Sequence, residues 1–436
     1  MHSPPPHGHP LRGPDPLSGA IPLVGRDDEL EALEALVENR ERGTSLVLLA
    51  GEGGVGKSRL VAELSDRVGR RGWTVARGRA YPVERGVPYA LFSDAFLPIL
   101  RDMEADTLTV LSRGGEAELA HLFPALTLGD GAPSRPDPGS DPEEFRTRIL
   151  WNFTEFLSSY ASRAPLLVVL EDLHWADDSS LRLLHFVARQ VTGQPLFLVG
   201  TYNQAERERN PRLVRTEQSL LSLRAAEVRQ LEPLSRAQIS DLVCRMFGVD
   251  EAVAADFCSF LYGWTRGNPF FTEEVLKSLV SSRRLRRDGD RWLGWEAREI
   301  GLPGSIRDAV LVRVSGFSDA ARTVAELTAV VGSRASHPLL ASVVDLTEAD
   351  LLGALEELCA HRILSEEAVD GTVVYDFVHP VVRQTLYGEF GLQRARMLHG
   401  VVAEALEAYR GADAMEHADE LAYHFARTDA DHLAGK

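Results

Sequence analysis

Cysteine is scarce in this sequence: Cys244, Cys258 and Cys359 are the three cysteines among 436 residues. They lie far apart in apolar, helix-like surroundings, without C-x-x-C spacing and without a histidine at metal-ligand spacing. This pattern argues against a cysteine-based metal site. We therefore expect three buried thiols.

Long apolar runs are also missing. No run approaches the roughly 18 residues that a membrane-spanning helix needs, and the first 20 residues contain no apolar segment of the kind found in secretory signals. These absences exclude an integral membrane protein and a secreted one of the usual type. We expect a cytoplasmic location and no membrane partner.

Positive charge is in deficit, because the formal net charge is −17. Nucleic acid attracts basic surfaces, so binding through the overall field of the protein is excluded, although a local basic face remains conceivable. The densest basic cluster is Arg283–Arg287, but Asp288 and Asp290 follow it directly. We predict a solvated loop there rather than a nucleic-acid contact.

The remaining composition is that of a folded protein. Hydrophobic residues make up 44% and charged residues 25% of the chain, and the length predicts about two to four domains. Residues 1–20 are rich in proline, glycine and histidine, which predicts a disordered leader. Its histidines, His2, His7 and His9, could bind a metal, but they have no acidic or cysteine partner nearby.

The segment Ser45–Ser58 carries the clearest chemical signal. An apolar run leads into a glycine-rich loop in which Gly51, Gly56, Lys57 and Ser58 match the spacing G-x-x-x-x-G-K-[ST]. Glycines let backbone N–H groups curl round a phosphate. The lysine can reach the β- and γ-phosphates, the hydroxyl of Ser58 can bind Mg²⁺, and a helix N-terminus follows. The segment predicts a nucleotide-phosphate site.

A second landmark is the apolar run Pro165–Asp172, which ends in two acids. A buried parallel strand whose carboxyl end points at a ligand has this pattern. We predict that Glu171 contributes to the Mg²⁺ shell and that Asp172 polarises the attacking water. The alternative is a buried strand whose terminal acids are merely solvated.

A third apolar run, Leu196–Asn203, is expected beside it in the sheet. Asn203 would then face the γ-phosphate as a phosphate or water sensor, unless it is an ordinary strand-terminal asparagine. A further strand at Trp73–Arg77 completes a β-α-β succession. These runs predict an α/β P-loop domain with a parallel sheet and helices on both faces.

Beyond Leu231 the pattern changes to helices joined by short loops. Later, helices followed by a hairpin with an Asp370-Gly371 turn predict a winged helix. The predicted segments are a leader (1–20), a P-loop nucleotide-binding domain (21–230), a helical lid (231–300), a winged-helix domain (301–390) and a helical segment (391–436).

Several separate motifs resemble the signal-transduction ATPases with numerous domains, the STAND class of P-loop proteins. The closest resemblance is to the ATPase module of large ATP-binding regulators of the LuxR family. The motifs are Leu23–Leu30, Val87–Tyr89, Leu173–Asp177, Gly200–Tyr202, Gly267–Pro269 and Phe377–His379. The resemblance covers nearly everything from Leu23 to Phe425.

The resemblance implies further site residues. Val24, Gly25 and Arg26 would pack on the adenine, Pro269 would lie against the base, and His379 would touch the β-phosphate in a resting state. It also implies that the helical segment at 391–436 begins a repeat array. The predicted nucleotide-binding residues are Val24, Gly25, Arg26, Gly51, Gly53, Gly54, Val55, Gly56, Lys57, Ser58, Arg59, Asn203, Pro269 and His379. The predicted catalytic residues are Lys57, Glu171 and Asp172, and the predicted Mg²⁺ ligands are Ser58 and Glu171.

The sequence departs from the family pattern at two site positions and at its end. Glu171 stands where the family has aspartate, which would slow hydrolysis, and Asn203 replaces an arginine, which weakens γ-phosphate sensing. Family members continue into repeats and a helix-turn-helix, whereas this sequence stops within what resembles the first repeat. DNA binding is therefore not assignable to these residues.

The predicted function is an ATP-binding signal-transduction switch with slow hydrolysis, the regulatory ATPase module of a transcriptional regulator. Its cofactors would be ATP or ADP with Mg²⁺. Its partners would be an unknown inducer or protein signal and, in some states, further copies of itself. The alternatives are a DNA-loading AAA+ ATPase of the replication-initiator kind and a nucleotide-binding scaffold without turnover.

Overall fold

The protein is described by a computed structural model that divides into two compact units, Gly25–Glu232 and Met1–Val24 with Pro233–Lys436. The described residues are 23–38, 45–123, 141–191, 193–288, 291–295, 304–332, 335–369, 371–410 and 418–428. The predicted leader lies outside these residues. The finer division into four folded segments remains a prediction.

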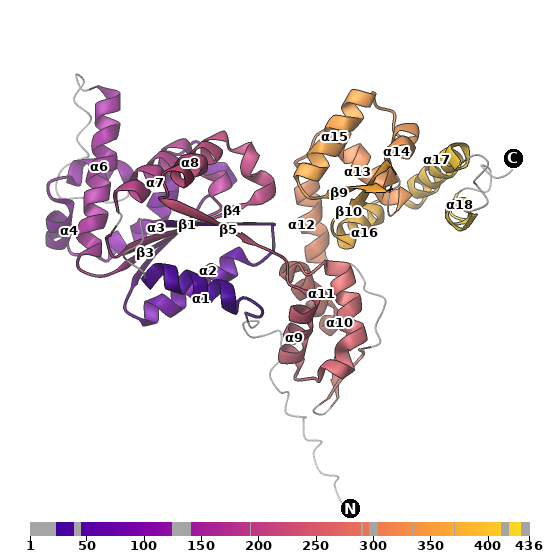
Figure 1. The fold of residues 1–436 in the computed structure, drawn as a ribbon, viewed down its shortest axis with the longest axis horizontal. Coiled ribbons are helices and arrows are strands. Elements are labelled where there is room, and N and C mark those ends of the chain that lie inside the picture. The colour runs from indigo at the N-terminus through magenta and orange to yellow at the C-terminus, as the bar shows by residue number, and fades with distance from the viewer. Residues whose placement is uncertain are drawn as a thin grey trace, which may run out of the picture. The chain divides into compact units, whose positions relative to one another are not determined.

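The unit Gly25–Glu232 is built on a five-stranded parallel sheet (Figure 1). The strand order is β2-β3-β4-β1-β5. The strands are β1 (Leu46–Gly51), β2 (Thr74–Arg79), β3 (Leu166–Glu171), β4 (Leu196–Asn203) and β5 (Ala226–Leu231). The predicted parallel sheet is thus confirmed, and β4 has the predicted bounds. The edge strand β5 was not predicted, because Glu227 and Arg229 interrupt its apolar pattern.

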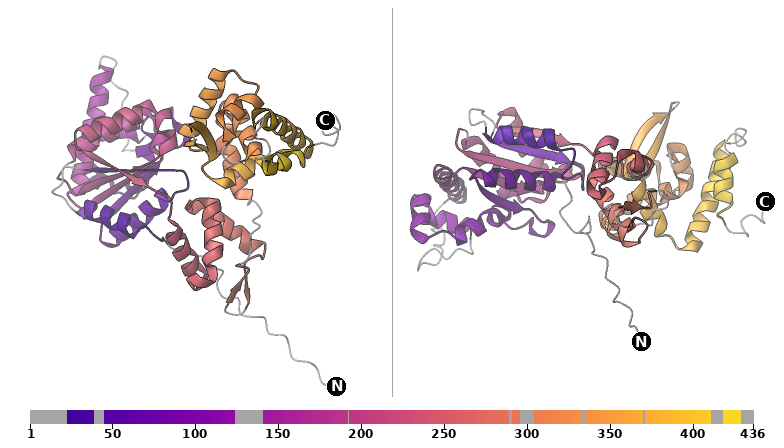
Figure 2. Two further views of the ribbon diagram at one scale, coloured as in Figure 1. Left: turned by 45° about the vertical axis from the view of Figure 1, so that its right-hand side comes forward. Right: turned by 90° about the horizontal axis from the view of Figure 1, so that it is seen from below.

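Helices cover both faces of this sheet (Figure 2). Leu46, Leu48 and Ala50 of β1 pack into a core shared with helices on one face, whereas the alternate residues Val47 and Leu49 are buried toward the other. The helices are α1 (Asp27–Glu38), α2 (Lys57–Arg70), α3 (Ala90–Arg101), α4 (Ala105–Ser112), α5 (Glu116–Leu122), α6 (Pro142–Ala161), α7 (Asp178–Gln190) and α8 (Pro211–Ser222), with short turns η1 (Pro82–Glu84), η2 (Leu173–Trp175) and η3 (Gln204–Arg209).

Helix α1 forms where the spacing of apolar residues predicts it. It buries Leu30, Leu33, Leu36 and Val37 on one face and places acids in its first turn, where they complement the helix dipole. The loop predicted at 129–142 falls mostly outside the described residues. Pro142 itself opens α6, with Asp141 as the N-cap that accepts the N–H of Glu143.

The other unit contains helices, a two-stranded hairpin and a three-stranded antiparallel sheet in the order β8-β10-β9. Its elements are α9 (Arg236–Phe247), α10 (Glu251–Thr265), α11 (Pro269–Ser281), β6 (Arg286–Asp288), β7 (Arg291–Leu293), α12 (Gly304–Ser315), α13 (Asp319–Val331), β8 (Ala335–Ser336), α14 (His337–Val343), α15 (Glu348–Ala360), β9 (Leu364–Val369), β10 (Thr372–Phe377), α16 (Pro380–Gly388), α17 (Leu392–Arg410) and α18 (Ala418–Phe425). No helix in the described ranges is long and apolar enough to span a membrane.

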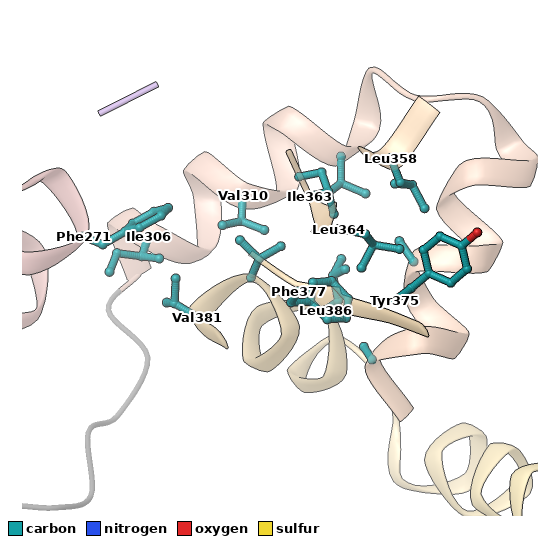
Figure 3. Packing of buried hydrophobic residues seen from close by; sticks show 14 of the residues in the cluster. Phe271, Ile306, Val310, Leu358, Ile363, Leu364, Tyr375, Phe377, Val381 and Leu386 are labelled. Atoms are coloured by element: carbon teal, nitrogen blue, oxygen red, sulfur yellow. The ribbon is translucent and has the colours of Figure 1, made fainter. Parts of the chain in front are cut away.

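One hydrophobic core runs through this unit (Figure 3). Phe271 of α11 lies near Ile306 of α12, and the core continues to Phe377 of β10 and Leu386 of α16. The hairpin β9-β10 pairs from Leu364↔Phe377 to Val369↔Thr372, and of the predicted turn residues Gly371 lies between the two residues of this last pair whereas Asp370 lies outside the described residues. A strand pairing on its other edge, β8, was not predicted.

Two predictions for this unit need correction. The segment Arg283–Arg287 is not wholly a loop, because Arg286–Asp288 forms β6 and pairs with β7, although its side chains are exposed. Trp292 of β7 packs edge-on against Phe247, which anchors the hairpin to α9. Of the three cysteines only Cys258 is fully buried, and Cys244 and Cys359 are partly exposed.

Gly78 offers a test of how α3 packs against β2. A Cβ atom at this position would lie 2.4 Å from the carbonyl oxygen of Leu91 and 2.8 Å from the backbone nitrogen of Ala95. Because backbone atoms of α3 cannot move aside cheaply, Gly78→Ala should lower the free energy of unfolding by about 1–3 kcal/mol. Urea unfolding followed by tryptophan fluorescence measures this change.

Gly69→Ala is the matched control, because a Cβ at Gly69, near the end of α2, meets nothing within 4 Å. Alanine in a helix should leave stability unchanged or raise it by up to ~1 kcal/mol. Equal effects of the two substitutions would contradict the packing described for α3.

Candidate functional site

The loop between β1 and α2 has a backbone that glycine makes possible. Gly54 and Gly56 have positive φ angles of 81° and 102°, a conformation that other residues adopt only with strain. At Gly51 a Cβ would lie 2.8 Å from the carbonyl oxygen of Leu231 in β5. The loop leads directly into α2, whose N-terminus is the positive end of the helix dipole.

Lys57, the first residue of α2, lies folded over this loop. Its Nζ donates hydrogen bonds to the carbonyl oxygens of Gly51 and Glu52, each at 2.9 Å. Burial lowers the pKa of Lys57 to about 8, although the charges of Asp172, Glu52 and Glu206 oppose this shift. The ammonium group of Lys57 is thus held at the phosphate loop and is partly shielded from solvent.

Glu171 ends β3 and lies opposite Arg79 of β2 in the parallel register. Its carboxylate is 2% exposed and accepts Arg77 Nε at 2.7 Å and Arg79 Nη2 at 3.2 Å. Burial alone would raise the pKa of Glu171, but hydrogen bonds from Ser58 and Arg77 and the charges of both arginines lower it overall. Glu171 is therefore an ionised, buried carboxylate in contact with Ser58.

Asp172 follows in the left-handed backbone region, with φ at 59°. Its N–H donates to Thr201 Oγ1 on β4 at 3.2 Å, and its carboxylate lies 3.2 Å from Arg79 Nε. Burial and the charge of Glu171 raise the pKa of Asp172, while Arg79 and Lys57 oppose them. The backbone turn thus directs Asp172 away from the strand, with its side chain 31% exposed.

Asn203 ends β4 directly beside Gly51, its partner in the register with β1. Its Nδ2 donates to Glu206 Oε1 at 3.2 Å, and a Cβ on Gly53 would lie 3.8 Å from that same Nδ2. Asn203 therefore lies beside the phosphate loop, and its contact with a γ-phosphate remains a prediction. Its amide is already bonded to Glu206.

His174 supports this corner of the site. Its Nδ1 accepts the N–H of Asn203 at 3.3 Å, and its Nε2 lies 3.8 Å from a carboxylate oxygen of Glu206. Burial, with the charges of Lys57 and Arg85, lowers the pKa of His174 to about 3. The ring is therefore neutral, with its proton on Nε2 toward Glu206.

The sequence motifs Val87–Tyr89 and Leu173–Asp177 are joined at Asp177. The side chain of Asp177 accepts the N–H of Tyr89 at 3.1 Å and that of Ser180 at 2.9 Å, so it both joins the segments and caps α7. The carbonyl oxygen of His174 accepts Arg85 Nη2 and Asn210 Nδ2. These bonds fix the turn that follows the acidic strand.

The N-terminal residues of the predicted nucleotide set have structural contacts of their own. Arg26 donates to the carbonyl oxygens of Val55 in the loop and Glu232 after β5, and it pairs with Glu29 at 2.9 Å. Val24 belongs to the core of the other unit, and Arg59 is exposed on α2. Their roles at a nucleotide remain predictions.

Pro269 and His379 lie in the other unit. Pro269 opens α11, where the Asn268 side chain caps the helix by accepting the N–H of Phe270 at 3.1 Å. His379 is buried, its Nδ1 lies 3.1 Å from the carbonyl oxygen of Thr265, and its ring meets Phe271 edge-on. Their predicted contacts with a nucleotide also remain predictions.

Sequence reasoning missed four residues of this site: Arg77, Arg79, His174 and Glu206. The arginines had a detectable signal, because residues two apart at the carboxyl end of a strand share one face of the sheet. Glu206 lies three residues beyond Asn203 in the short 3₁₀ helix η3, which is too short to carry a periodic pattern. His174 was noted only as part of a motif.

The oxygen donors at this edge suit a magnesium ion. Ser58 supplies a hydroxyl, and Glu171 and Asp172 supply carboxylates next to the N-terminus of α2. Mg²⁺ prefers such hard oxygen ligands and usually takes only one or two carboxylates in sites that also bind phosphate. These residues therefore fit Mg²⁺ with a nucleotide.

Comparison with known proteins identifies this part of the chain. Residues 22–199 match the AAA ATPase domain family, and the phosphate loop and the acidic strand both lie within the matched residues. An uncharacterized protein of Rhizobium meliloti (strain 1021) is 25% identical over 425 residues, covering 93% of this chain and 39% of that protein. The chain thus spans about two-fifths of the length of that relative.

Solved structures show lower similarity. Cdc6p of Pyrobaculum aerophilum is 12% identical with a TM-score of 0.41, covering 87% of this chain and 99% of that one. The ORC2 protein of Aeropyrum pernix is 12% identical with a TM-score of 0.35, covering 86% of this chain and 98% of that one. A STAND protein with a tetratricopeptide repeat sensor from Pyrococcus horikoshii is 12% identical with a TM-score of 0.31, covering 94% of this chain and 49% of that one. At these values the similarities assign no function to the chain.

The lowered pKa of Lys57 predicts a pH dependence of nucleotide binding. The charged ammonium attracts phosphate, so affinity should be full below the pKa of the free protein and fall as pH rises through about 8, where Lys57 loses its proton. The decline should approach tenfold per pH unit. Titration of a fluorescent ATP analogue at a series of pH values between about 7 and 9.5 measures it.

Lys57→Arg is the control, because a guanidinium stays charged throughout this range. Its affinity, whatever its absolute value, should be nearly constant with pH. A parallel decline in the variant would assign the titration to another group.

Proposed function

We propose that the chain is an ATP-binding switch module with slow hydrolysis, the regulatory ATPase part of a larger signalling protein. The observation that carries this proposal is the meeting of Lys57, Ser58, Glu171 and Asp172 at one edge of the parallel sheet, around a loop that requires glycine. Phosphate-binding loops, a magnesium ion and a carboxylate that orients water are the recurring parts of P-loop ATPases.

In this proposal each residue has a defined task. The loop N–H groups and Lys57 bind the β- and γ-phosphates, and Lys57 exchanges its bonds to Gly51 and Glu52 for bonds to phosphate oxygens. Ser58 and Glu171 hold Mg²⁺, which neutralises phosphate charge when it is bound. Asp172, whose raised pKa makes it the stronger base of the two acids, accepts a hydrogen bond from the attacking water.

Slow turnover is supported by two features of the site. Glu171 is held between two arginines, so its carboxylate is less available to a metal than a free one would be. Asn203 offers an amide that is already bonded to Glu206, where a charged arginine would stabilise the γ-phosphate more strongly. Both features favour binding over hydrolysis.

The switch itself would use the other unit. We propose that residues 231–300 act as a lid and 301–390 as a winged helix, with Pro269 and His379 contacting the nucleotide in one arrangement only. ATP and ADP would then make different contacts with these residues. The number of phosphates on the bound nucleotide would therefore shift the equilibrium between two arrangements of the domains. An inducer or protein signal, transcriptional output and self-association belong to the same proposal.

A DNA-loading ATPase of the replication-initiator kind is the second candidate. The proposed wing weighs against it, because the sequence Leu364–Phe377 contains four acids and no lysine or arginine. Glu366 and Glu367 are exposed on β9, where they would repel a phosphate backbone.

The proposed ATPase activity is tested by phosphate release from the full chain with Mg²⁺·ATP. Lys57→Ala should reduce both ATP affinity and turnover, whereas Asp172→Asn should retain affinity and reduce turnover by roughly 10²-fold or more. Lys277→Ala is the matched control, since Lys277 is a surface lysine paired with Glu273 and Glu274. Phosphate release at one background rate in all four proteins would leave a nucleotide-binding scaffold.

A titration with duplex DNA separates the two candidates. For the switch module we expect weak binding because the protein and the proposed wing are acidic. Fluorescence anisotropy of a labelled duplex at several salt concentrations measures it. Tight binding that weakens steeply with salt would favour the DNA-loading candidate.

A further inference from the structure

We infer that Arg79 is an internal competitor of Mg²⁺: its guanidinium occupies the oxygen atoms that would hold the metal, so Mg²⁺·nucleotide binding has to displace it. This inference rests on the proposed nucleotide function. It concerns a residue that no sequence motif of the site includes.

Arg79 contacts both predicted metal ligands, Ser58 and Glu171, and also the neighbouring carboxylate of Asp172. Its Nη2 lies 3.3 Å from Ser58 Oγ and 3.2 Å from an oxygen of Glu171, and its Nε lies 3.2 Å from an oxygen of Asp172. A guanidinium is planar and directs several N–H groups at such oxygens at once. Arg79 therefore covers these oxygens with two hydrogen bonds, to Ser58 and Glu171, and with an ion pair to Asp172, where a divalent cation would coordinate them.

The pairing of β2 with β3 fixes the backbone of Arg79 beside the site. Arg79 pairs with Glu171 across β2 and β3, and its own N–H donates to the carboxylate of Asp94 at 2.8 Å. The backbone of Arg79 is thus anchored beside the site. Displacement would have to move the side chain alone.

The Arg79 side chain is exposed enough to swing away from the site, whereas the side chain of its partner Glu171 is buried. The Arg79 side chain is 42% exposed, whereas the Glu171 side chain is 2% exposed. A guanidinium that swings into water regains its hydration, but the buried carboxylate then needs another cation. Mg²⁺ is the cation that the oxygen donors fit.

Arg77 provides a matched comparison. It lies two residues earlier on the same strand, has the same 42% side-chain exposure and pairs with Glu171 at 2.6 Å. The contacts of Arg77 with predicted metal ligands are to Glu171, whereas Arg79 also reaches Ser58 and Asp172. Removing Arg79 should therefore change the response to Mg²⁺ more than removing Arg77.

The experiment is a Mg²⁺ titration of the full chain with a fixed amount of a fluorescent ATP analogue, started in chelator. For Arg79→Ala and Arg79→Met, half-saturation should occur at a Mg²⁺ concentration at least about fivefold lower than for the wild type, the lower end of typical coupling between two ligands. Arg77→Ala should shift it less. Arg79→Met keeps the aliphatic bulk, so it separates loss of charge from loss of packing.

A second measurement needs no nucleotide. Mg²⁺ alone should raise the melting temperature of both Arg79 variants more than that of the wild type, because the uncovered carboxylates bind it. Equal Mg²⁺ midpoints in wild type and Arg79 variants, or an equal shift in Arg77→Ala, would overturn the inference. If no protein binds the analogue at any Mg²⁺ concentration, the proposed nucleotide function fails, and the melting temperatures still decide the role of Arg79.

Discussion

The buried carboxylate of Glu171 is the constraint on which the arrangement of the site depends. An ionised group that is 2% exposed needs charged or hydrogen-bonding partners, since a buried, unpaired charge costs several kcal/mol. The parallel register of β2 and β3 supplies Arg77 and Arg79 on one side, and Ser58 of α2 supplies a hydroxyl on the other. One carboxylate thus joins Ser58, at the start of α2, to the edge of the sheet.

Much of this edge could be predicted from the sequence because its signals are local. The glycine spacing before Lys57 and the apolar run before Glu171 each combine a strand with the chemistry at its end, and parallel strands bring such ends together. The parallel sheet, with β4 beside β3, was predicted on these grounds and is found in the structure. Helix α1 followed from its periodicity in the same way.

The features that escaped prediction depend on partners distant in sequence. Arg77 and Arg79 contact Glu171 because β2 pairs with β3, which lies about ninety residues later in the sequence. A single sequence does not show which strands are neighbours. The edge strand β5 lacks a continuous apolar run because its residues between Ala226 and Leu231 are only partly buried or exposed. Glu206 lies in a 3₁₀ helix of six residues, which is too short to show a periodic pattern.

The same contacts bear on the glutamate that stands where the STAND class, which the sequence resembles, has an aspartate. A glutamate side chain is one methylene longer, and here its carboxylate contacts both Arg77 and Arg79 of β2 as well as Ser58. Holding that carboxylate between two guanidinium groups stabilises the site without a metal, and it removes electron density from the ligand that Mg²⁺ would use. A site built in this way has its buried charge balanced without a metal. That property would suit the proposed switch, which has to persist between events, better than an enzyme selected for rapid turnover.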